Sequence, residues 1–181
     1  EGTIAHGKLQ KDNENIYEDY QKEVKLQWGF IRDNIELIIE GRTDGIIKES
    51  NNVIIEEIKS TYKSLIYIEE DYNELHWAQG KFYGYIYCKE NNLKKIRIRL
   101  SYYDLNTDEV KSFEKEFILT ELEAFVSELV ETYMKAVLLK IALMEERNKS
   151  IEEMEFPFPT YRKGQRELAV TCYNTIRNNG V

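Results

Sequence analysis

Two acidic side chains and a lysine stand at spacings that could build a hydrolytic site. Asp44 lies in the segment GRTDG, and Glu57 and Lys59 lie two residues apart in a later segment, IIEEIK. Side chains two apart on a strand share a face, so Glu57 and Lys59 should point the same way while Glu56 points the opposite way. The first question is therefore whether Asp44 comes near this pair.

Antiparallel pairing of the two segments would bring the acids together. If residues 49–52 form a hairpin loop and Lys48 pairs with Val53, the register places Asp44 directly across from Glu57. Their Cβ atoms would then be about 5 Å apart. Facing carboxylates repel unless a cation lies between them, and oxygen ligands suit Mg²⁺ or Mn²⁺. The nearby lysine could orient a nucleophile and stabilise charge that develops on a phosphate.

The same charges also suit a solvated hairpin without a catalytic role. An acid two residues before a lysine is common, and residues 114–116 form a similar charge run, EKE. Other polar side chains favour a site, because His76, Gln79 and Tyr83 share one face of an expected helix. Gln79 and Tyr83 could hydrogen-bond a phosphate. His6 could add an imidazole ligand and shift the metal preference towards Mn²⁺.

Four short motifs occur in an order and spacing that resemble the RecB-like branch of the PD-(D/E)XK nucleases. The resemblance covers most of residues 1–149, and its motifs are Gly2-x-x-x-His6, Gly41-Arg42-x-Asp44-Gly45, Glu57-x-Lys59 and Gln79-x-x-x-Tyr83. It implies an α/β fold of the restriction-endonuclease type, a mixed β-sheet flanked by helices. It also implies metal-dependent cleavage of DNA, often single-stranded or at ends.

The resemblance also implies roles for individual residues. His6, Asp44 and Glu57 would bind Mg²⁺ or Mn²⁺, and Lys59 would be catalytic together with the two acids. Gln79 and Tyr83 would support the site. Some relatives carry a four-cysteine iron-sulfur cluster, whereas this chain has only two cysteines, so no such cluster is expected.

A second resemblance lies near the end of the chain. The segment FPFPTYRKGQ, which spans 156–165, resembles the entry to the motor of DinG-like and XPD-like superfamily 2 helicases. In that family the glutamine contacts adenine, which would make Gln165 a nucleotide-binding residue. The phosphate-binding G-x-x-x-x-G-K-[ST] loop does not follow within these residues. ATP is therefore expected to bind only in a longer parent protein, with the missing motor acting in cis. The competing interpretation is a simple terminal helix.

Hydrophobic periodicity predicts a mixed α/β organisation. A helix starting near 69 should be entered through Asp71 or Asn73, and Thr120 with Glu123 suggests a capping box for a long amphipathic helix. A composition shift places a domain boundary near Ser150, which gives a nuclease-like domain at 1–149 and a helicase-like start at 150–181. Strands are expected at 23–32, 35–41, 42–48, 53–59, 93–105 and 110–118, and helices at 69–88, 120–147 and 163–177.

Composition leaves three classes of function open. A net charge of −8 argues against a general nucleic-acid coat, although a basic strand face at Lys95, Arg97 and Arg99, with Lys94 beside it, could follow a DNA backbone. No segment resembles a membrane span or signal peptide, so a cytoplasmic protein is expected. The candidates are a metal-dependent deoxyribonuclease, an inactive module that guides single-stranded DNA to a motor, and a protein-interaction domain whose 120–147 helix docks on that motor.

Overall fold

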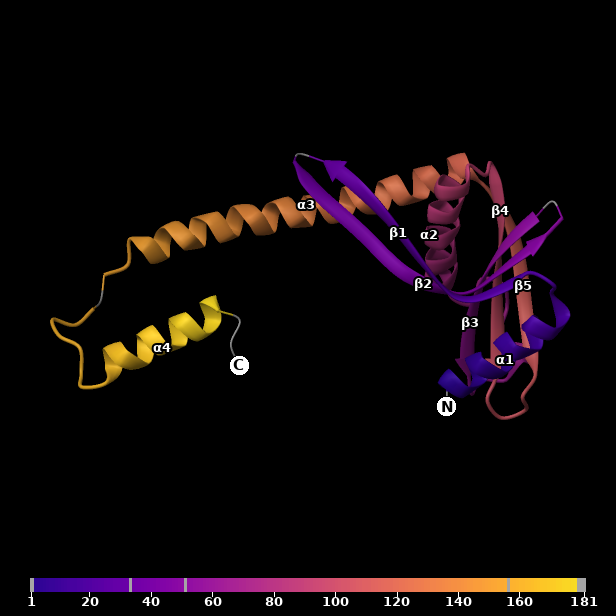
Figure 1. Ribbon diagram of the computed structural model, residues 1–181, viewed down its shortest axis with the longest axis horizontal. Helices are drawn as coiled ribbons and strands as arrows, with labels where there is room; N and C mark the ends of the chain where they lie inside the picture. Colours follow the sequence, from indigo (N-terminus) through magenta and orange to yellow (C-terminus); the bar gives the residue numbers. More distant parts are fainter. Residues whose placement is uncertain (1, 33, 51, 156, 179–181) are drawn as a thin grey trace. The chain divides into compact units, whose positions relative to one another are not determined.

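The computed structural model describes residues 2–32, 34–50, 52–155 and 157–178. Five strands and four α-helices follow one another in the order α1, β1, β2, β3, α2, β4, β5, α3, α4, with a short 3₁₀ helix before α2 (Figure 1). Their bounds are α1 Gly2–Ile16, β1 Tyr20–Arg32, β2 Ile35–Glu49, β3 Asn52–Thr61, η1 Leu65–Tyr67, α2 Glu74–Asn91, β4 Lys95–Asp104, β5 Val110–Ile118, α3 Leu119–Glu152 and α4 Gln165–Arg177.

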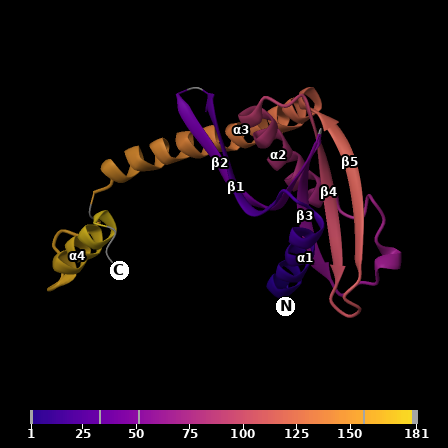
Figure 2. The ribbon, with the colours of Figure 1, turned by 45° about the vertical axis from the view of Figure 1, so that its right-hand side comes forward.

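The strands form one mixed sheet in the order β1-β2-β3-β4-β5. Neighbouring strands are antiparallel except β3 and β4, which are parallel. A parallel pair needs a crossover connection, and α2 supplies it. Helices lie on both sides of the sheet (Figure 2). The expectation of an α/β fold with a mixed sheet flanked by helices is therefore confirmed.

Helix α2 packs closely on one face of the sheet. The core there joins Trp77 of the helix to Ile98, Leu100 and Tyr102 of β4. Gly80 makes the close approach possible, because a Cβ at this position would lie 2.5 Å from Cγ2 of Ile98. The glycine that weakens the sequence case for a helix is thus the residue that lets the helix reach the sheet.

Helix α1 covers part of the other face and was not predicted. Its apolar contribution is small, since the core cluster here joins Ala5 and Leu9 to Ile58 and Tyr103. The rest of its buried surface is polar and includes Gln10, which is 6% exposed. Hydrophobic periodicity misses such a helix because its inward face carries amides instead of apolar side chains.

Several predicted elements have different bounds. β2 is one continuous strand where two were expected, and α2 begins after Asn73, whose side chain accepts a hydrogen bond from the backbone N–H of Leu75. The predicted capping box of Thr120 and Glu123 is wrong. Instead, Glu121 accepts from the backbone N–H of Ile118, because α3 begins one residue earlier than expected.

The chain divides into two compact units, residues 1–132 and 133–181. The first unit contains the whole sheet, α1 and α2. The second contains the later part of α3 and α4. The expected division near residue 150 stays a prediction. In the part of the chain that the structure describes, no helix is long and apolar enough to cross a membrane.

Candidate functional site

Asp44 lies where β2 separates from β3. The ladder between these strands includes the predicted pair of Lys48 with Val53 and ends at Gly45 opposite Glu56, one step before Asp44. At this point a side chain takes over from the β2 backbone as the hydrogen-bond acceptor. Asp44 Oδ2 accepts a 2.7 Å hydrogen bond from the N–H of Ile58. The acid is thereby fixed to the middle of β3.

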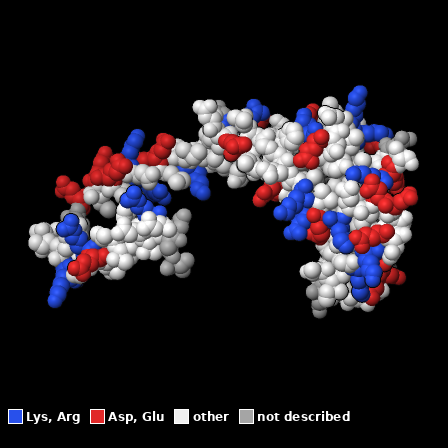
Figure 3. Space-filling view, in the orientation of Figure 1, with Lys and Arg blue, Asp and Glu red and all other residues white. Residues whose placement is uncertain are grey.

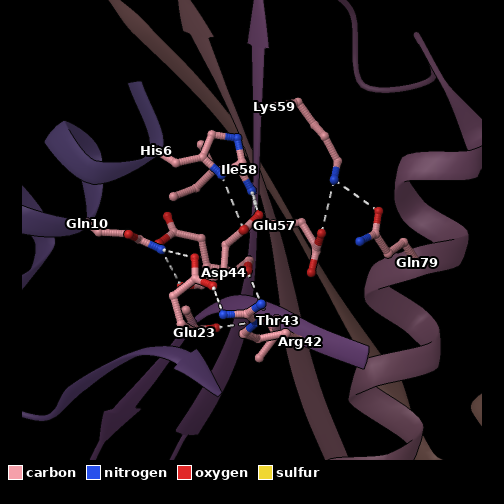
Figure 4. A network of polar contacts seen from close by, with 12 residues as sticks. His6, Gln10, Glu23, Arg42, Thr43, Asp44, Glu57, Ile58, Lys59 and Gln79 are labelled. Carbon is pink, nitrogen blue, oxygen red and sulfur yellow. Dashed lines mark hydrogen bonds and ion pairs between the residues drawn. The ribbon is translucent and has the colours of Figure 1, made fainter. Parts of the chain in front are cut away.

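Glu57, Lys59 and Gln79 form a connected group on the α2 side of the sheet. The Lys59 ammonium donates to Glu57 Oε2 at 3.0 Å and to Gln79 Oε1 at 2.9 Å. The first two residues lie two apart on β3, and Gln79 lies on α2, so the lysine joins the strand to the helix (Figure 4). Glu56 points to the opposite face, where Asn13 and Ser101 donate to it. The expected alternation along β3 is confirmed.

The Glu57 carboxylate is buried and only half satisfied. Its side chain is 1% exposed, against 21% for Lys59, and its Oε1 has no hydrogen-bond partner. The pKa of Glu57 is raised to about 7, mainly by burial; the charge of nearby Asp44 contributes to this increase and Lys59 opposes it. An orphaned buried carboxylate oxygen costs free energy, so this atom needs an explanation.

His6 reaches Asp44 from the α1 side. Its Nδ1 lies 3.3 Å from Asp44 Oδ1, and the hydrogen bond to Asp44 raises the pKa of His6. Figure 4 shows these residues on either side of β3, with His6 on α1 and Gln79 on α2. The structure therefore places five of the predicted site residues around β3 in two contact groups, His6 with Asp44 and Lys59 with Glu57 and Gln79.

A supporting set of residues was missed by sequence reasoning. Gln10 donates to the Asp44 carbonyl at 2.9 Å and to Glu23 at 3.1 Å, and Glu23 forms a 3.2 Å ion pair with Arg42. Glu23 has a φ of 54° within β1, an uncommon conformation for a residue other than glycine. The only sequence signal for this set was Arg42 in the GRTDG motif.

Tyr83 and His76 serve packing and hydrogen bonding around the site. The Tyr83 ring lies so close to Gly41 that a Cβ there would stand 2.5 Å from its hydroxyl oxygen. The two His76 ring nitrogens already lie 3.1 Å from the Asn73 side chain and 2.9 Å from the Tyr102 hydroxyl. Of the three α2 residues that share a face, only Gln79 contacts Lys59.

The donor chemistry of the site fits a hard divalent cation. The imidazole of His6 lies 3.3 Å from the Asp44 carboxylate, and Glu57 Oε1 is the type of orphaned oxygen that a cation would satisfy. As they stand, no three His, Cys, Asp or Glu side chains among the described residues lie close enough together to hold an ion. The fit therefore rests on the types of donor and on this one unpartnered atom.

The predicted DNA-binding side chains lie away from this group. Lys94 is exposed just before β4, and Arg97 lies on the opposite face of the sheet from Glu57. Arg97 Nε is 4.0 Å from Glu116 of β5, which also pairs with Lys95. The space-filling view likewise shows acidic and basic side chains intermingled over the sheet unit (Figure 3). A role for Lys94 and Arg97 in DNA binding stays a prediction.

Two other cations lie next to the site. Lys25 and Arg42 are direct partners across β1 and β2, and both line a hollow of about 460 Å³. Like charges in directly opposite positions destabilise a strand pair unless anions accompany them. Glu23 forms an ion pair with Arg42, and Glu40 and Glu90 line the same hollow, so anions accompany the two cations.

Gln165 begins α4 in the second unit. Its side-chain oxygen accepts a 3.1 Å hydrogen bond from the N–H of Arg162, within the turn that precedes the helix. Gly164 has a φ of 81° at this turn, which glycine adopts without strain. Phe156, the first residue of the helicase-like motif, lies outside the described residues. Nothing in this geometry tests whether Gln165 binds a nucleotide.

Comparison with known proteins gives little further information. No family model matches the chain, and no curated protein matches it. One similar solved structure is that of SSO0001, which is 20% identical with a TM-score of 0.47. The match covers 72% of this chain and 58% of SSO0001, so the matched part spans less than two thirds of that protein.

Proposed function

We propose that this chain is a divalent-metal-dependent deoxyribonuclease domain that hydrolyses phosphodiester bonds in single-stranded DNA or at DNA ends. The observation that carries this proposal is the buried Glu57 carboxylate, with one oxygen bound to Lys59 and the other without a partner, beside Asp44. A purely structural acid would be expected to have both oxygens satisfied. The resemblance of four ordered motifs to RecB-like PD-(D/E)XK nucleases supports the same conclusion.

Different residues of the site would have different roles in catalysis. His6, Asp44 and Glu57 would hold Mg²⁺ or Mn²⁺, which when bound would neutralise phosphate charge and acidify water. Lys59 is already held by Glu57 and Gln79, so its ammonium needs little reorganisation to donate to a phosphate oxygen.

The surroundings support a nucleic-acid substrate. Arg42 lies on the strand that carries Asp44 and Lys25 on the neighbouring strand, and these cations line a hollow, together with Glu40 and Glu90, where they could contact a phosphate. The motif around Gln165 supports a parent protein in which an ATP-dependent helicase motor feeds a strand to the nuclease. A cytoplasmic location belongs to the same proposal.

The direct test is a cleavage assay on the whole chain with end-labelled single-stranded and duplex DNA. Cleavage should require Mn²⁺ or Mg²⁺ and stop with EDTA. Lys59→Ala should lower the rate by about 100-fold or more, the scale on which lost transition-state donors act. Lys135→Ala removes an exposed lysine on α3, a helix that carries none of these residues, and should leave the rate unchanged. Full activity in EDTA, or in Lys59→Ala, would rule out this mechanism.

Asp44 needs a separate variant because it also binds the backbone of β3. Asp44→Asn keeps a side-chain oxygen that can accept from the Ile58 N–H while it removes the negative charge. Activity should be lost although the fold, followed by circular dichroism, is retained. An active Asp44→Asn protein would contradict the assignment of Asp44 as a metal ligand.

A second candidate is an inactive module that guides single-stranded DNA. It is favoured by one observation, that no three potential ligands are grouped closely enough to hold an ion in the described parts of the chain. This candidate predicts tight single-strand binding without cleavage under any metal condition. A wild type that binds single-stranded DNA tightly without cleaving it, with binding kept in Lys59→Ala and Asp44→Asn, would favour this module over a nuclease.

A further inference from the structure

The later part of α3 exposes apolar side chains on more than one face, and one row of them has a regular spacing. Ile141 is 38% exposed, Met144 41% and Ile151 54%, and Val137 is half-buried. These residues continue, at spacings of three and four, a stripe that begins with Val130 and Met134, both of which are buried. The stripe therefore extends from a covered part of the helix into a part that the described residues leave open.

This stripe follows a heptad repeat. Positions d and a alternate through Val130, Met134, Val137, Ile141, Met144, Asn148 and Ile151. Because Val130 and Met134 are covered within the chain, the seam open to a partner runs from Val137 to Ile151, about two heptads, with the spacing of a coiled coil. The single polar residue in the seam is Asn148, at an a position. A lone asparagine there costs stability and fixes register and the number of strands.

The flanking charges complement one another in one arrangement. Position g carries Lys140 and Arg147, whereas position e carries Glu145 and Glu152. In a parallel pair, each g side chain faces the e side chain of the next heptad on the partner. Lys140 would then face Glu145 of the second copy, and Arg147 would face Glu152. An antiparallel pair would instead place basic g positions opposite each other.

We propose that the later part of α3 pairs with a second copy of this chain as a parallel, two-stranded coiled coil. The seam supplies apolar knobs, and the g and e charges select a parallel partner with the same sequence. Figure 3 shows acidic and basic side chains next to one another towards the C-terminal end of α3. This inference does not depend on the proposed nuclease activity.

Sedimentation equilibrium of the whole chain tests the pairing. The wild type should show twice the chain mass of 21.5 kDa, with dissociation on dilution. Ile141→Glu combined with Met144→Glu should give the monomer mass. Leu139→Glu combined with Leu143→Glu is the matched control, because these leucines are 62% and 56% exposed on the outer face of the helix. A wild-type monomer, or a dimer lost only in the control, would overturn the proposal.

A charge exchange tests the partner and its direction. A variant with Glu145→Lys and Glu152→Lys should be monomeric by itself, because like charges would then face each other at every g and e contact. Mixing it with a Lys140→Glu, Arg147→Glu variant should restore the dimer. Failure of the mixture to dimerise, when the wild type does, would show that some other surface joins the copies.

Disulfide formation tests the register. In a Cys172→Ser background, which removes the exposed native thiol, Ile151→Cys should cross-link readily because the two d positions face each other. Lys149→Cys places the thiol at an outer b position and should not cross-link. Efficient cross-linking of the second variant alone would exclude the parallel, in-register pair.

Discussion

A carboxylate buried as deeply as Glu57 is difficult to ionise, and this gives the site a measurable dependence on pH. Its pKa of about 7 lies above the ordinary value of 4.5. Between these two pH values, Glu57 therefore keeps a proton in the folded protein that it would release in the unfolded chain. The additional stability that this proton gives the folded state is complete below the ordinary pKa and is lost as pH rises through about 7.

In the absence of divalent metal, the wild type should lose roughly 2–3 kcal/mol of unfolding free energy between about pH 5 and pH 8 through this group. Glu57→Gln should remove most of that loss, because the amide carries no proton to release. Urea unfolding at both pH values measures the difference. Glu116→Gln, at an exposed position on β5, should keep the wild-type slope, and equal slopes in all three proteins would show that Glu57 is not the titrating group.

For single residues, the sequence was sufficient where the two-residue period of a strand alone determines which face a side chain occupies. The alternation along β3 placed Glu57 and Lys59 together because a strand has a period of two. Gln10 and Glu23 could not be found in this way. Their contacts depend on a polar helix packing over the sheet and on a left-handed residue within β1, neither of which leaves a hydrophobic pattern.

At the scale of elements, the position of Gln79 depends on how closely α2 approaches β4. Gly80 sets that distance, and it directly follows the residue that binds Lys59. Alanine at this position would force the helix away from Ile98 or displace the isoleucine from its rotamer. The site and the core are therefore coupled through one glycine.

Gly80→Ala should destabilise the chain by about 1–3 kcal/mol, since overpacking outweighs the gain in helix propensity. Gly7→Ala in α1 is the matched control. A Cβ there meets nothing within 4 Å, so the change should stabilise by about 0.5–1 kcal/mol. Thermal unfolding of the three proteins compares them. A stabilised Gly80→Ala protein would show that α2 can move away without cost.

The positions of the strands were predicted better from the sequence than the residues at which they begin and end. β5 was found with the bounds that the structure has, because it alternates regularly and ends where a helix begins. β2 was divided into two strands because the GRTDG segment resembles a break. The structure keeps one strand there, since Gly41 and Gly45 accommodate the rings of Tyr83 and Tyr20.

At the scale of the whole molecule, the two cysteines report separately on the two units. Cys88 lies in α2 with 0% exposure, and burial raises the pKa of its thiol to about 11. Cys172 lies exposed on α4. Thiolate is the reactive form, so the buried thiol should be inert at neutral pH for as long as the first unit stays folded.

A thiol reagent such as DTNB should therefore modify Cys172 rapidly and Cys88 only after global unfolding. The rate at Cys88 should follow the opening of the first unit and increase in Gly80→Ala. Cys172→Ser should abolish the rapid phase and leave the slow one. Rapid reaction of Cys88 in the native protein would contradict its burial in the core.

The hydrogen bond from the Ile58 N–H to Asp44 gives this site its own spectroscopic reporter. The carboxylate that would receive a ligand is the same group that protects this amide. Changes of charge at Asp44 should thus alter the chemical shift and solvent exchange of one main-chain proton, without any added label. Titrating the chain with Mg²⁺ or an oligonucleotide would allow occupancy to be read from that single resonance.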